Sequence, residues 1–148
     1  MTLYIYYIYI LYFLFFTIFS FFFHNCFRIL NLFFYSTITL SVITLFFFFN
    51  KSLFFYQFYA KLASSSLYNT KYVIGIDGLS IILVLLSTYI IYCCLLNFWH
   101  LRYQMQMYVF LLTLTLLFLI HVFTVLDFFF FFIAFEAVVI PLFLIVGI

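Results

Sequence analysis

Charged residues and small residues are both scarce in this sequence of 148 residues. Only 5% of the residues are charged, 72% are hydrophobic, and the chain has three glycines and one proline. Because a soluble domain is about one quarter charged and about half apolar, so few charges could not cover the apolar surface of a water-soluble globule. A soluble domain, a disordered chain and a coiled coil are therefore excluded. The net charge of +2 is too small to indicate nucleic acid as a partner, which leaves an integral membrane protein.

The cysteines and histidines are few and badly spaced for a bound group. Cys93 and Cys94 are adjacent and Cys26 lies far away in the sequence, which does not fit a disulfide framework or a metal cluster. No two histidines have the i, i+4 spacing that would hold haem or a metal on one helix. We therefore expect this chain to bind no metal and no cofactor.

Aromatic residues are abundant instead, with 28 phenylalanines and 14 tyrosines. Phe, Tyr, Leu and Ile can be written with A/T-rich codons, whereas Gly, Ala and Pro cannot, so this composition indicates an A/T-biased genome such as that of an organelle. No amphipathic presequence rich in Arg and Ser precedes the first apolar run. If the protein acts in the mitochondrion, we expect it to be encoded and made there.

Five apolar stretches are long enough to cross a membrane. About 20 mostly apolar residues span the ~30 Å of hydrocarbon, and within lipid the backbone must be hydrogen-bonded inside the segment, which favours helices over strands. The sequence therefore predicts an all-α integral membrane protein with five transmembrane helices, at residues 3–23, 30–49, 79–98, 106–125 and 128–148.

These helices divide the chain into three parts. Residues 1–50 predict two lipid-facing transmembrane helices, 51–76 a polar connection, and 77–148 three further transmembrane helices. The connection holds three lysines of the five basic residues, and the alternation around Tyr56–Phe58 indicates a small hairpin or an interfacial segment. The basic residues are divided too evenly between the two sides to fix the orientation.

Glu136 is the main candidate functional residue, because it lies within the last apolar run. At 1.5 Å per residue it is roughly 13 Å from Asp127, near the middle of the bilayer. An isolated carboxylate there costs at least ~2.5 kcal/mol, and ionisable groups inside a membrane are usually functional. An acid that gains and loses a proton at this depth can act as a proton relay. The alternative is a protonated glutamate that joins two helices through a hydrogen bond.

Residues around Glu136 are also informative. Pro141, five residues on, predicts a disturbed turn that either holds water or only packs. Ala134 and Ala137 flank the acid, and small residues allow another helix to approach closely.

The remaining candidates have two interpretations each. Asp127 and Asp77 both precede a predicted helix and are first of all N-caps, with Gly75 and Gly78 shaping the turn around Asp77. Asp127 is alternatively a point of proton access at the membrane surface. His121 lies inside the fourth predicted helix, where it either hydrogen-bonds a neighbouring helix or belongs to a proton wire.

Two motifs resemble the signature of NADH dehydrogenase subunit 4, an antiporter-like proton-pumping subunit of respiratory complex I. Residues 126–148 contain L-D, an aromatic-rich stretch, F-E, I-P and a closing I-x-G, with Glu136 nine residues after Asp127. A proline five residues after the glutamate separates this subunit from its two antiporter-like sisters. Residues 75–80 read G-I-D-G-L-S and match the start of the family's third helix. The resemblance is strong over 126–148, fair over 54–98 and unreadable over 1–50.

The resemblance implies an N-terminal portion of a membrane-arm subunit of the proton-translocating NADH:ubiquinone oxidoreductase. Glu136 would match the fifth-helix glutamate, which in the family pairs with a lysine on a later, broken helix. NADH, FMN, iron–sulfur clusters and ubiquinone would be bound by other subunits and none by this chain. Its partners would be other complex I membrane subunits and membrane lipid, with no nucleic acid, and its location the mitochondrial inner membrane as a multi-pass protein.

The sequence departs from the family in two ways. Where the family usually has a second acid in its fourth helix, this sequence has Leu116; His121 lies about 140° around the helix from it and is a poor substitute. The family also continues with further helices beyond Ile148. We therefore expect either a truncated sequence or a partner chain that supplies those helices and two intramembrane lysines, beginning near a W-G that continues from Gly147–Ile148.

Two other classes of function remain open. One is a structural or assembly membrane subunit of a respiratory complex, in which Glu136 only holds helices together. Such a subunit would not need the E-x-x-x-I-P pattern. The other is a small ion or solute carrier, which should have polar residues from several helices at mid-membrane, where this sequence offers Glu136 and His121.

Overall fold

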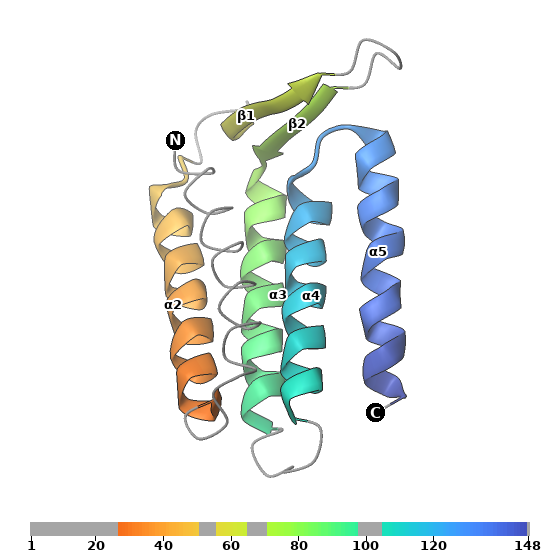
Figure 1. Cartoon of the computed structure of the whole chain (residues 1–148). Coiled ribbons are helices and arrows are strands. Elements are labelled where there is room, and N and C mark those ends of the chain that lie inside the picture. Colours follow the sequence, from red (N-terminus) through yellow and green to blue (C-terminus); the bar gives the residue numbers. More distant parts are fainter. Residues whose placement is uncertain (1–26, 51–55, 65–70, 98–104, 148) are drawn as a thin grey trace.

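The computed structural model describes residues 27–50, 56–64, 71–97 and 105–147 (Figure 1). These form four helices, α2 (Phe27–Phe48), α3 (Gly78–Asn97), α4 (Met105–Thr124) and α5 (Phe128–Val146), and two strands, β1 (Gln57–Ser64) and β2 (Lys71–Ile76). All four helices are long and apolar enough to cross a membrane. The predicted transmembrane helices from residue 30 onward are thus confirmed, and the one predicted at 3–23 lies outside the described residues.

The four helices stand side by side, and each runs antiparallel to the one before it (Figure 1). Contacts between helices follow the chain order, with α2 on α3, α3 on α4, and α4 on α5. Helix α4 therefore has neighbours on two sides, and α5 packs on α4 at one edge of the row. We call the end where α2 and α4 finish and α3 and α5 begin the hairpin end, because the two strands lie there (Figure 1).

The strands form an antiparallel hairpin, which decides between the two structures considered for the connection. Their register runs from Gln57 opposite Ile76 to Ser64 opposite Lys71, with irregularities between Gln57 and Ala60 and between Lys61 and Ala63. Phe58 lies in the first irregular stretch with φ at 55°, in the left-handed region that non-glycine residues rarely adopt.

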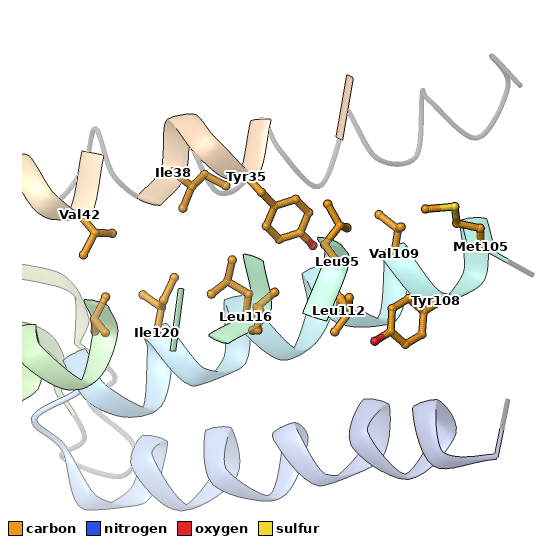
Figure 2. Packing of buried hydrophobic residues seen from close by; sticks show 12 residues of the cluster. Tyr35, Ile38, Val42, Leu95, Met105, Tyr108, Val109, Leu112, Leu116 and Ile120 are labelled. Atoms are coloured by element: carbon orange, nitrogen blue, oxygen red, sulfur yellow. The ribbon is translucent and has the colours of Figure 1, made fainter. Parts of the chain in front are cut away.

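Buried apolar side chains from α2, α3 and α4 form the main core, shown in close-up in Figure 2. Tyr35 of α2 is 1% exposed, and its hydroxyl donates to Thr113 Oγ1 of α4 at 3.3 Å. The expectation that residues 1–50 form lipid-facing helices is therefore wrong for one side of α2. The core consists of Tyr35, Ile38, Val42, Val84, Ile91, Leu95, Met105, Tyr108, Val109, Leu112, Leu116 and Ile120.

Most hydroxyl groups inside the helices bond to their own helix. Thr113 donates to the carbonyl of Val109 at 2.6 Å, and Thr124 donates to that of Ile120 at 2.9 Å. Ser87 does the same with Val84 at 2.9 Å. Because these donors are satisfied within their own helix, the hydroxyl groups of buried serines and threonines are tolerated in a membrane helix.

Candidate functional site

Glu136 lies midway along α5, as the ninth of its 19 residues, and its side chain is exposed on the surface of this chain. No hydrogen bond or ion pair joins it to any residue in the part of the chain that the structure describes. The sequence predicted this position near the middle of the helix. The chain by itself, however, does not bury the carboxylate.

The orientation of Glu136 follows from the way α5 packs. Ala134 and Val138 are buried against Val122 of α4, with Phe118 and Phe123 beside them. Glu136 is two residues from Ala134 and two residues from Val138, and two residues correspond to a rotation of about 200° around a helix. It therefore points away from α4.

Glu136 lines a shallow apolar groove of about 470 Å³ on the outer face of α5. The other residues of this groove are Val139, Ile140, Phe143 and Leu144. We call this surface the Glu136 groove. Its single carboxylate in an otherwise apolar lining can accept a hydrogen bond or an ion pair from one basic side chain, while the rest can pack against an apolar helix.

Pro141 and Ala134 belong to the opposite side of α5. Both are buried, together with Val138, and the spacing of 134, 138 and 141 places them on the helix face that meets α4. The helix continues through Pro141, which cannot donate a hydrogen bond to the carbonyl of Ala137. This location favours the packing interpretation of Pro141 over a water-binding turn beside Glu136.

Asp127 is the N-cap of α5, as predicted. Its backbone is extended, with φ −86° and ψ 126°, and Oδ1 accepts a hydrogen bond from the N–H of Phe129 at 3.1 Å. Its carbonyl also accepts from the N–H of Phe131 at 3.0 Å. The carboxylate thus satisfies a helix-terminal donor that would otherwise be free.

Asp77 also stands just before a helix, but Ser80 provides the cap. The N–H of Asp77 donates to Ser80 Oγ at 2.6 Å, and the Ser80 hydroxyl donates back to the Asp77 carbonyl at 2.9 Å. Of the residues that the structure describes, none donates to the Asp77 carboxylate. Asp77 is thus the N-cap by position, since its carbonyl accepts from the N–H of Ile81 at 3.1 Å, but its carboxylate takes no part. The serine three residues on was the missed signal.

Gly75 lies within β2 and not in the turn that was predicted for it. A Cβ atom at this position would be 3.0 Å from Leu126 Cδ1 and 3.2 Å from Tyr56 Cβ. Gly75 thus allows the strand to approach the connection between α4 and α5. Gly78 has more room, since its nearest neighbour would be Phe49 at 3.6 Å.

His121 is half-buried in the last turn of α4, and its partner comes from the hairpin. The hydroxyl of Tyr72 in β2 forms a hydrogen bond with the imidazole, lying 3.1 Å from Nδ1 and closer to Nε2. The two rings are stacked, with centroids 5.4 Å apart. His121 thus has a partner in the hairpin, which the sequence did not predict. The strand alternation Tyr72, Ile74, Ile76, which faces the bundle, is the signal that could have found Tyr72.

Leu116, which stands where the family usually has an acid, lies in an apolar environment. Leu116 is 3% exposed and belongs to the main core, where an acid would need a buried partner. Among the residues that the structure describes, no cluster of three or more His, Cys, Asp or Glu side chains could hold a metal ion.

Comparison with known proteins supports the resemblance to NADH dehydrogenase subunit 4. No protein-family profile matches the chain. NADH-ubiquinone oxidoreductase chain 4 of Chondrus crispus is 38% identical over 101 residues, which is 68% of this chain and 20% of that protein. The chain 4 protein of Mycosarcoma maydis is 43% identical over 76 residues, or 51% of this chain and 16% of that protein. This chain is a homologue of chain 4.

A bacterial relative extends the match. NADH-quinone oxidoreductase subunit M of Rhodobacter capsulatus is 36% identical over 77 residues, covering 52% of this chain and 15% of the relative. The chain therefore spans about a fifth or less of the length of these chain 4 and subunit M relatives. This agrees with the N-terminal portion that the resemblance implies, and the four apolar helices identify a multi-pass membrane protein.

Proposed function

We propose that this chain is part of the membrane arm of a proton-translocating NADH:quinone oxidoreductase in the mitochondrial inner membrane. The names of its chain 4 and subunit M relatives support membership of such a complex. NADH oxidation, flavin and iron–sulfur chemistry and quinone reduction belong to other subunits. The role of this chain is proton movement that those redox steps drive.

Within that role we assign Glu136 to a proton relay. The observation that carries this assignment is an acid at the middle of α5, exposed in the apolar Glu136 groove and unpaired within the described residues. In lipid an unpaired carboxylate costs at least ~2.5 kcal/mol. A helix with a basic side chain, packed over the groove, removes this cost by pairing with the carboxylate.

Such a pair can move a proton when its geometry changes. While the basic group is close, the carboxylate is stabilised in its charged form and releases its proton. When the basic group moves away, the carboxylate in its apolar groove takes a proton up again. Further helices of the same subunit, carried by a partner chain or by the rest of a longer chain, supply the basic side chain.

The other two candidate titratable residues have different positions. Asp127 is engaged in capping α5, and His121 is engaged with Tyr72 at the hairpin end. Glu136 points away from α4, so a direct proton transfer from His121 across the α4–α5 interface has no geometric support. If His121 or Asp127 takes part in proton transfer, the exchange is with the membrane surface.

The replacement Glu136→Gln tests this function against the structural alternative. Glutamine keeps the shape and the hydrogen-bonding capacity of the side chain but carries no exchangeable acid proton. We expect the complex to assemble at normal abundance while proton pumping drops severely. A subunit in which Glu136 only joins helices would pump almost normally with glutamine.

A further inference from the structure

Tyr72 joins three elements at the hairpin end. It belongs to β2, its hydroxyl bonds to His121 of α4, and its ring stacks on the imidazole with an interplanar angle of 23°. The same ring meets Phe130 of α5 edge-on, with centroids 4.8 Å apart and planes at 81°. One side chain thus connects the hairpin to both helices of the α4–α5 pair.

The backbone of β2 is tied to the same region. The N–H of Leu126 donates to the carbonyl of Val73 at 3.1 Å, and Ile74 forms an isolated antiparallel bridge with Val125. The α4–α5 connection therefore runs along β2 as a short additional pairing. Gly75 allows this close approach, since a Cβ there would be 3.0 Å from Leu126 Cδ1.

Helix α5 packs on α4 through a small set of buried residues. Its buried residues, Ala134, Val138 and Pro141, form one narrow apolar stripe against α4. Within lipid there is no hydrophobic driving force that selects one apolar face over another, so specific contacts set the rotation of such a helix. The contact of Tyr72 with Phe130 and the pairing at Leu126 are specific contacts of this kind.

We propose that Tyr72 is a positioning residue that fixes the rotation of α5 through His121 and Phe130. It thereby sets the direction in which Glu136 points. This inference rests on the proposed proton-relay function of Glu136. A rotation of α5 by about 30° would move a side-chain tip on a helix of 10–12 Å diameter by about 3 Å. A displacement of that size separates a carboxylate from a hydrogen-bonded partner.

The hydroxyl of Tyr72 is the part that can be removed without changing the packing. Tyr72→Phe keeps the ring stacked on His121 and in contact with Phe130, and loses only the bond to the imidazole. Tyr59→Phe is the matched control, because Tyr59 is an exposed tyrosine on the neighbouring strand whose ring lies 5.9 Å from Lys61 Nζ. Proton pumping per NADH oxidised is measured in vesicles that contain the assembled complex.

We expect Tyr72→Phe to lower proton pumping by about threefold, because loss of one hydrogen bond shifts the equilibrium between orientations of α5 by roughly two- to tenfold. The abundance of the complex should stay normal, and Tyr59→Phe should pump like the wild type. His121→Phe, which keeps a ring to stack on Tyr72, should give a loss similar to that of Tyr72→Phe. The double variant should be no worse than either single one, because both changes break the same interaction.

Three outcomes would overturn the proposal. Tyr72→Phe could pump as well per assembled complex as Tyr59→Phe. The two losses could multiply in the double variant. Finally, Tyr72→Phe could prevent the complex from assembling, which would show a merely structural role. If Glu136→Gln pumps normally, the proton-relay function itself fails. If Glu136→Gln blocks pumping and Tyr72→Phe does not, only the positioning role fails.

Discussion

Ala134 and Glu136 are separated by one residue in α5 but lie on opposite sides of the helix. Ala134 is 4% exposed and packs near Val122 of α4, whereas Glu136 is exposed in its apolar groove. The small residue therefore serves the contact between α4 and α5 within this chain. The acid is left for a partner on the outer side of α5.

The first prediction concerns the occupant of the Glu136 groove. A photoreactive benzophenone residue in place of Phe143, which lines the groove and is 77% exposed, should cross-link to a protein that has intramembrane lysines. The reason is that a carboxylate in an apolar groove needs a basic partner. The product is identified by mass spectrometry of the purified complex.

The matched control for this cross-link is the same photoreactive residue in place of Ile82, which is 56% exposed on α3. Adducts from position 82 show what an apolar surface elsewhere on the bundle contacts. If position 143 gives only lipid adducts, the groove faces acyl chains, and the assignment of Glu136 to a proton pathway is wrong.

The second prediction concerns the attachment of the hairpin. Gly75→Val should destabilise the protein by about 1–3 kcal/mol, because the added side chain has no room against Leu126 and Tyr56. The measurement is the thermal stability and the yield of the assembled complex. Gly78→Ala is the control, since its Cβ would find ordinary contact distances at 3.6 Å. Equal yields for the two variants would show that the close approach at Gly75 does not affect the stability of the protein.

The third prediction separates the two interpretations of Asp127. Asp127→Asn keeps an oxygen that can accept from the N–H of Phe129 but has no titratable proton. If Asp127 is only an N-cap, this variant should pump normally, while Asp127→Ala should destabilise α5 by about 1 kcal/mol. A variant Asp127→Asn that assembles but does not pump would instead establish proton access through this carboxylate.

The sequence was sufficient to predict the helices from residue 30 onward and the mid-helix position of Glu136. Both depend on hydropathy and on the fixed rise of a helix, which a chain with so few charges displays clearly. The Asp127 cap was predictable for a similar reason, since it depends only on neighbouring residues.

Which side of each helix faces a neighbouring element could not be predicted in the same way. Apart from Glu136, helix α5 is apolar around its whole circumference, so its hydrophobic pattern does not show which side meets α4. The partner of His121 was missed because Tyr72 is distant in sequence and lies in a strand. At the start of α3 the backbone of Asp77 bonds to the side chain of Ser80, a partner that the sequence did not identify.

The central claim is that Glu136 exchanges protons, and the most direct test is proton translocation by the Glu136→Gln complex in vesicles, normalised to the amount of assembled complex. Phe135→Leu, at an exposed apolar neighbour, is the control for packing in α5. We expect normal assembly with severely reduced pumping for Glu136→Gln, and unchanged pumping for Phe135→Leu. Pumping within about twofold of wild type, less than ~0.5 kcal/mol in a barrier, would contradict this claim.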